Sequence, residues 1–112
     1  MKQIMFSVFI ILFTSLSVFA QKNTTITDSF QVSGNCGMCK KRIESASMIK
    51  GVIAANWDIE SQIMKVTFKA NKTSADAIQQ SIAAVGHDTE KYKADEKAYK
   101  NLHSCCKYKQ KE

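Results

Sequence analysis

Two hydrophobic periodicities alternate along residues 24–92, and their order constrains the fold more than any other feature of the chain. Alternating apolar residues or clustered β-branched residues predict strands at 24–33, 52–59, 64–68 and 87–92. Apolar residues three or four apart predict helices at 39–50 and 75–85. The resulting order, β-α-β-β-α-β, is typical of a ferredoxin-like α+β sandwich, in which an antiparallel four-stranded sheet carries both helices on one face.

The first twenty residues are expected to lie outside this domain. Lys2 precedes a mostly apolar run over residues 4–16, and Val18-Phe19-Ala20 offers a small-residue cleavage site before Gln21. A basic start, an apolar stretch and a small-residue site in this order are typical of a secretory signal peptide. An uncleaved anchor is the alternative, although residues 4–20 are barely long enough to span a membrane. We therefore expect residues 1–20 to be removed, leaving a periplasmic or secreted protein without stable membrane association.

The remaining chain divides into a domain at residues 21–92 and a lysine-rich extension at residues 93–112, with a short amphipathic helix expected over 94–102. The whole sequence has a formal net charge of +6, and lysine is concentrated from Lys91 onward. We interpret the basic surface as a solvated face. The alternative is a docking face for an acidic partner, such as the metal domain of a transporter. Nucleic acid is not an expected partner of an exported chain.

The spacing of the four cysteines argues against a framework of stabilising disulfides. Cys36 and Cys39 are separated by two residues, whereas Cys105 and Cys106 are adjacent. Neither pair closes a loop long enough to restrict the unfolded chain much. Close pairs suit redox chemistry or metal binding better, although a plain disulfide at Cys36 and Cys39 stays an alternative.

Cys36 and Cys39 are expected where the first strand meets the first helix. Unpaired amides at a helix N-terminus favour thiolate over thiol, and Lys40, Lys41 and Arg42 add positive charge nearby. Thiolates select soft ions such as Cu(I), and two of them suffice for a near-linear Cu(I) or Hg(II) site. Zinc usually requires four ligands. A redox pair is the competing interpretation, but the chain has no proline, and thioredoxin-like folds place a cis-proline against their cysteine pair.

At these residues the sequence resembles the heavy-metal-associated domain family, which includes copper chaperones, N-terminal domains of copper and zinc transport ATPases, and the periplasmic mercury-binding protein. The resemblance covers about residues 24–92. It implies the ferredoxin-like fold and metal binding by Cys36 and Cys39. The matching residues are Cys36-Gly37-Met38-Cys39, Ile43-Glu44, Gly51-Val52, Ala55, Trp57, Ile78, Ile82 and Gly86-His87.

One triplet departs from the family pattern. The usual Gly-Met-Thr before the first cysteine is Ser33-Gly34-Asn35 here. The methionine of that triplet normally packs under the loop, and Gly34 cannot do so. Met38 is a candidate to compensate for it or is simply exposed, and the departure affects loop rigidity and metal preference.

Further candidate ligands lie after the second helix and in the extension. His87 is a candidate third ligand or a neighbour that tunes the thiolates, and the alternative is a surface histidine at a helix end. His103, Cys105 and Cys106 lie within four residues of one another and suit a soft metal. They could complete a site with Cys36 and Cys39, hold their own ion, or form disulfides.

Together these features predict a protein that is not an enzyme and that binds a soft metal ion, Cu(I) first and Hg(II) or Zn(II) as alternatives. It would act as an exported metal chaperone or scavenger, as a monomer or a metal-bridged dimer. A metal-transporting ATPase or another metal-binding protein would be its partner. A thiol–disulfide oxidoreductase is the first alternative, and a structural zinc site shared by the two cysteine pairs is the second. No phosphate-binding loop or nucleophile elbow stands out.

Overall fold

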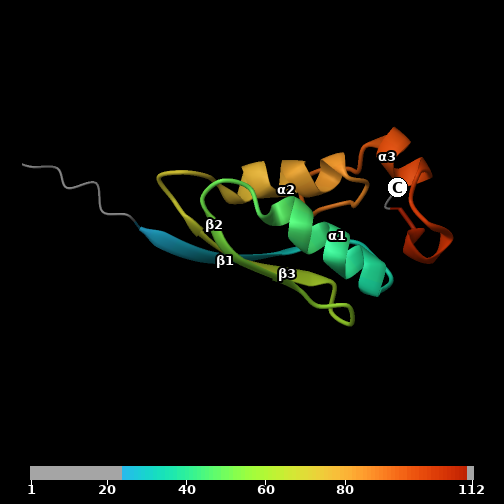
Figure 1. Ribbon diagram of the computed structural model, residues 1–112, viewed down its shortest axis with the longest axis horizontal. Coiled ribbons are helices and arrows are strands. Elements are labelled where there is room, and N and C mark those ends of the chain that lie inside the picture. The colour runs from blue at the N-terminus through green and yellow to red at the C-terminus, as the bar shows by residue number, and fades with distance from the viewer. Residues whose placement is uncertain (1–23, 111–112) are drawn as a thin grey trace, which may run out of the picture.

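The computed structural model describes residues 24–110, so the expected signal peptide lies outside the described residues. Figure 1 shows α1 and α2 on the same face of a sheet, with α3 at the end of the molecule where α1 begins. No helix within residues 24–110 is long and apolar enough to cross a membrane. The elements in chain order are β1 (Thr25–Gln31), α1 (Gly37–Ser47), β2 (Val52–Trp57), β3 (Ile63–Lys69), α2 (Ala75–Ala84), α3 (Glu96–Lys100) and the 3₁₀ turn η1 (Ser104–Cys106).

The sheet is antiparallel, with strand order β1-β3-β2. Met64 on the central strand lies opposite both Phe30 and Trp57, and all three side chains are buried. The alternation of Met64, Val66 and Phe68 therefore places one face of β3 against the helices, as the sequence predicts. Ile43 on α1 and Ile78 and Ile82 on α2 cover this face and complete the core.

The prediction of a fourth strand at residues 87–92 is wrong. In the part of the chain that the structure describes, the sheet has three strands, and only an isolated bridge joins Thr89 to Val32. The cause is a tight turn, because the N–H of Thr89 donates to the carbonyl oxygen of Tyr92 at 2.8 Å and the N–H of Tyr92 donates to Thr89 Oγ1 at 3.0 Å. These backbone groups are therefore used within the turn rather than along β1.

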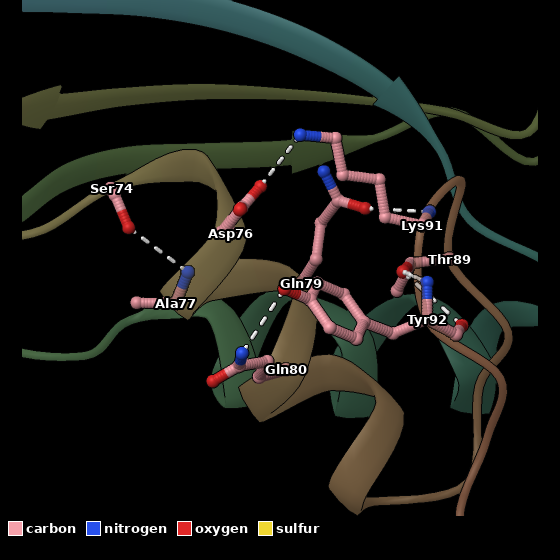
Figure 2. Close-up of polar contacts among 8 residues, drawn as sticks. All are labelled: Ser74, Asp76, Ala77, Gln79, Gln80, Thr89, Lys91 and Tyr92. Carbon is pink, nitrogen blue, oxygen red and sulfur yellow. Dashed lines mark hydrogen bonds and ion pairs between the residues drawn. The ribbon is translucent and has the colours of Figure 1, made fainter.

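Side chains of α2 hold this turn in place, as Figure 2 shows. Gln79 Oε1 accepts a hydrogen bond from the N–H of Lys91 at 3.0 Å, and Gln80 Nε2 donates to the hydroxyl of Tyr92 at 3.1 Å. The Lys91 ammonium also pairs with Asp76 at 2.9 Å. The turn therefore occupies the edge next to β1 while bonding to the helix, and the ferredoxin-like fold class is retained.

The helix boundaries differ slightly from those expected. α1 begins at Gly37 rather than residue 39, because Cys36 has the extended backbone of an N-cap. The helix ends at Ser47. α2 begins where expected, and Ser74 caps it by accepting from the N–H of Ala77 at 3.1 Å (Figure 2). The earlier start of α1 places Cys39 in its first turn.

The C-terminal extension packs on the domain. The expected helix at 94–102 is the shorter α3, and the chain then continues through η1. Leu102, Cys106 and Tyr108 are 7%, 0% and 3% exposed and belong to the same hydrophobic core as Phe30 and Ile43. The lysine-rich extension therefore buries the side chains of Leu102, Cys106 and Tyr108 against the domain.

Candidate metal centre

The two cysteines of the loop before α1 lie at the N-terminus of that helix. Cys36 is the N-cap residue and is half-buried, while Cys39 is fully buried in the first helical turn. Their sulfur atoms are 3.5 Å apart. The backbone N–H of Cys39 lowers the pKa of Cys36 to about 6, with smaller contributions from the neighbouring thiols and against an opposing effect of burial. The loop therefore presents one readily ionised thiol beside one sheltered thiol.

Trp57 fills the space under this loop. A Cβ atom on Gly34 would lie 2.9 Å from Trp57 Cη2, so glycine is needed for the indole to reach this place. The indole N–H donates to the carbonyl oxygen of Val32 at 2.9 Å, and Gln62 Nε2 donates to the carbonyl oxygen of Gly34 at 2.7 Å. The absence of methionine from the Ser33-Gly34-Asn35 triplet is thus compensated by a tryptophan from β2, whereas Met38 is exposed.

His87 supports the other side of the loop. Its Nδ1 lies 2.8 Å from the carbonyl oxygen of Ser33, to which it donates in the Nδ1–H tautomer, and its ring stacks on Tyr108 at 5.6 Å between centroids. Burial lowers the pKa of His87 below its ordinary value. The residue is fully buried and is not among the residues whose ligand atoms cluster at the cysteines. The structure therefore places His87 as a buried support of the loop, rather than as the surface residue of the alternative interpretation.

Tyr108 fixes the end of the extension next to the loop. Its hydroxyl donates to the carbonyl oxygen of Gly86 at 2.7 Å and accepts from the N–H of Asp88 at 2.8 Å. Tyr99 then donates its own hydroxyl hydrogen to the carbonyl oxygen of Tyr108 at 2.6 Å. These bonds place η1 against the start of α1.

The extension brings two more sulfur atoms to the pair. Cys106 Sγ lies 3.3 Å from Cys36 Sγ, and the ligand atoms of Cys36, Cys39 and Cys106 all lie within 4.8 Å of one another. Cys105 Sγ lies 3.4 Å from Cys36 Sγ, but its side chain is exposed and its thiol donates to Met38 Sδ at 3.6 Å. Burial raises the pKa of Cys106. All four cysteines are free thiols.

The basic residues expected to flank the pair have different roles. The Lys40 ammonium donates to the carbonyl oxygen of Trp57 at 2.7 Å and pairs with Glu44 at 3.1 Å, which ties α1 to β2. Arg42 acts electrostatically on Cys106 and on His87 and contributes to lowering the pKa of each. His103 is the exposed N-cap of η1 and is not part of the sulfur cluster.

Sequence reasoning did not identify Tyr108 as a residue of this site. The spacing of Tyr99, Leu102 and Cys106 is that of an amphipathic helical stripe, and it could have indicated that the extension packs on the domain. Nothing in the local sequence around Tyr108 points to Gly86, which is its distant partner.

Comparisons with solved structures agree with this geometry, although no family model and no curated protein sequence matches the chain. A CopZ metallochaperone is 29% identical over 57% of this chain and 98% of its own, with a TM-score of 0.55. Oxidized MerP from Ralstonia metallidurans CH34 is 28% identical over 60% of this chain and 96% of its own, with a TM-score of 0.56. A ZiaAN sub mutant is 32% identical over 59% of this chain and 96% of its own, with a TM-score of 0.51.

The chain belongs to the heavy-metal-associated domain family. This membership agrees with the expected ferredoxin-like fold and with a binding protein rather than an enzyme. These heavy-metal-associated domains match about three-fifths of the present chain, whereas its sulfur cluster also includes Cys106 near the C-terminus.

Proposed function

We propose that this protein binds one soft metal ion, Cu(I) in the first instance, through the thiolates of Cys36 and Cys39. The observation that carries the proposal is the 3.5 Å separation of the two sulfur atoms at the N-terminus of α1. The family supports it, because the structures similar to this chain include a metallochaperone and the MerP protein. Hg(II) and Zn(II) are the alternative ions.

The chemistry of the loop suits capture of a soft ion from a donor. Cys36 is half-buried with a lowered pKa, so its thiolate is available to bind first, and buried Cys39 then closes the site. Soft thiolates discriminate against hard ions such as Mg²⁺ and Ca²⁺. Release follows the reverse order, because an incoming thiolate of a partner can bind the ion before Cys39 dissociates.

The proposed place of action is the periplasm or the exterior of the cell, and the proposed role is that of a metal chaperone or scavenger. The N-terminal signal-like sequence supports export. A metal-transporting ATPase or another metal-binding protein is the proposed partner. The intact mass of the exported protein tests the proposed export, because cleavage after Ala20 leaves Gln21 as its first residue. A mass that retains residues 1–20 contradicts it.

Anaerobic titration of the reduced protein with Cu(I), read by native mass spectrometry, tests the metal site. We expect one Cu(I) per chain, and loss of this binding in the Cys36→Ser/Cys39→Ser double variant. Ser45→Ala, on the exposed side of α1, is the control and should bind as the parent does. Parallel titrations with Zn(II) and Hg(II) rank the ions. Equal Cu(I) binding by the parent and the double variant contradicts the proposal, and unfolding of the protein by a zinc chelator favours the structural zinc alternative.

A thiol–disulfide oxidoreductase is the second candidate, because the pKa of Cys36 is lowered to about 6 beside a second thiol. An insulin-reduction assay separates the two functions. We expect no turnover above that of the Cys36→Ser variant. Sustained turnover without metal, together with failure to bind Cu(I), favours the oxidoreductase.

A further inference from the structure

We infer that the C-terminal extension supplies Cys106 as a third thiolate to the ion held by Cys36 and Cys39, so that the extension retains the metal as well as packing on the domain. The inference rests on the proposed function and deepens it. It changes the coordination number of the site and the rate at which the ion leaves.

The position of Cys106 is defined by the fold. Leu102 and Tyr108 anchor the chain on either side of it in the hydrophobic core, and the Tyr108 hydroxyl bonds to the turn after α2. Cys106 is fully buried, whereas its neighbours Cys105 and Lys107 are exposed. Of the two adjacent cysteines, one therefore points into the protein and the other remains at the surface.

The spacing of the sulfur atoms fits one ion bound by three thiolates. Metal–sulfur bonds of about 2.3 Å place three sulfur atoms about 4 Å apart around an ion in their plane. The sulfur atom of Cys36 lies 3.5 Å from that of Cys39 and 3.3 Å from that of Cys106, and all three atoms lie within 4.8 Å of one another. A shift of a few tenths of an ångström in the side chains accommodates an ion.

The charge around Cys106 also fits a bound metal. A singly charged soft ion with three thiolates carries a net charge of −2, which is costly in a buried site without a compensating cation. Arg42 acts to lower the pKa of Cys106 against the effect of burial, and its Nη1 is buried without a hydrogen-bond partner among residues 24–110. Arg42 therefore offers a buried cation that acts on Cys106 and has an unused donor.

Cys105 provides the matched control for this inference. It is adjacent to Cys106 in sequence and its sulfur lies 3.4 Å from that of Cys36, but it is exposed and lies outside the group of three. Substitution of Cys105 by serine removes a thiol of the same segment without emptying the buried position. A general effect of the extension and a specific effect of Cys106 are thereby separated.

The test compares the reduced protein with its Cys105→Ser and Cys106→Ser variants after loading with Cu(I). X-ray absorption at the copper edge reports the number of sulfur ligands, and a Cu(I)-specific chelator reports the rate of removal. We expect three sulfur ligands in the parent and in Cys105→Ser, and two in Cys106→Ser. We expect removal from Cys106→Ser to be at least about tenfold faster, in line with the effect of altering groups around a metal site.

The outcomes distinguish this inference from the proposed function. Two sulfur ligands in all three proteins, with equal removal rates, overturn the third ligand and leave the two-thiolate site intact. Absence of bound Cu(I) in the parent overturns both. Circular dichroism checks that Cys106→Ser is folded. If it is not, Tyr108→Phe, which keeps all four thiols but loosens the extension, should speed removal, and an unchanged rate in that variant overturns the inference.

Discussion

The hydroxyl of Tyr108 donates to the carbonyl oxygen of Gly86 at 2.7 Å, across a separation of 22 residues. This bond joins the end of the chain to the turn that follows α2, in a buried environment. The same hydroxyl accepts from the N–H of Asp88, which precedes the bridge between Thr89 and Val32. One side chain therefore sets the position of η1 relative to the loop that contains Cys36.

Substitution of Tyr108 by phenylalanine should lower the free energy of unfolding by about 1–3 kcal/mol, because it removes two buried hydrogen bonds while keeping the ring. Urea denaturation followed by circular dichroism measures the change. Tyr92→Phe is the control, since its hydroxyl only accepts an exposed bond from Gln80, and it should change stability by less than about 0.5 kcal/mol. Equal effects of the two substitutions would show that the extension does not depend on the Tyr108 hydroxyl.

His87 should make the protein less stable as the pH falls. Burial lowers its pKa in the folded state, so below about pH 6.5 the unfolded chain takes up a proton that the folded protein does not. The stability contribution of the neutral ring is therefore complete above this pH and decreases as the pH falls towards the folded-state pKa. The slope reaches at most about 1.4 kcal/mol per pH unit.

The His87→Asn variant tests this dependence, because asparagine can still donate to the carbonyl oxygen of Ser33. Urea denaturation between about pH 7.5 and about pH 5 should show a shallower loss of stability in this variant than in the parent. Comparison with the parent cancels the titration of Cys36, which both proteins share. His103→Asn, at an exposed position, should show the same pH dependence of stability as the parent. If His87→Asn also shows the parent's pH dependence, buried His87 is not its source.

Local patterns were sufficient to predict the elements that form the domain. The alternation of Met64, Val66 and Phe68 gives the central strand, and Ser74 caps α2 where expected. The placement of Cys36 and Cys39 at a strand-to-helix junction also follows from the sequence, because the change from one periodicity to the other occurs at that point. These features depend on residues that are close together in the chain.

Contacts between distant residues could not be predicted in this way. Gly86 looks like a helix terminator in the sequence, and its φ of 107° fits that role. A Cβ atom at this position would also lie only 3.0 Å from the backbone carbon of Ala98, so the glycine lets α3 approach closely. The expected strand at residues 87–92 is a turn instead, closed by bonds between Thr89 and Tyr92 and held by the distant side chain of Gln79. The inward position of Cys106 likewise depends on the packing of α3 and Tyr108, which no short pattern reveals.

The four thiols should differ in reactivity in the metal-free, reduced protein. The pKa of Cys36 is lowered to about 6, and its side chain is half-buried, so iodoacetamide at about pH 7 should modify Cys36 before buried Cys106, whose pKa is raised. The rate at Cys36 should fall as the pH decreases through about 6, because the thiol replaces the reactive thiolate. Mass spectrometry of the labelled peptides measures the order. Modification of Cys106 before Cys36 would contradict the arrangement of the site.

A methyl group on Gly34 should disturb the loop, whereas one on Gly37 should not. The added Cβ at Gly34 would lie 2.9 Å from Trp57 Cη2 and 3.1 Å from the Cβ of Cys39, whereas nothing lies within 4 Å at Gly37. Because the indole is fully buried, the clash cannot be relieved by moving a side chain into solvent. Gly34→Ala should therefore lower the free energy of unfolding by about 1–3 kcal/mol, the usual cost of overpacking. Gly37→Ala should leave it unchanged within about 0.5 kcal/mol. Urea denaturation of both variants measures the difference, and equal stabilities would show that Trp57 does not fill the space under the loop.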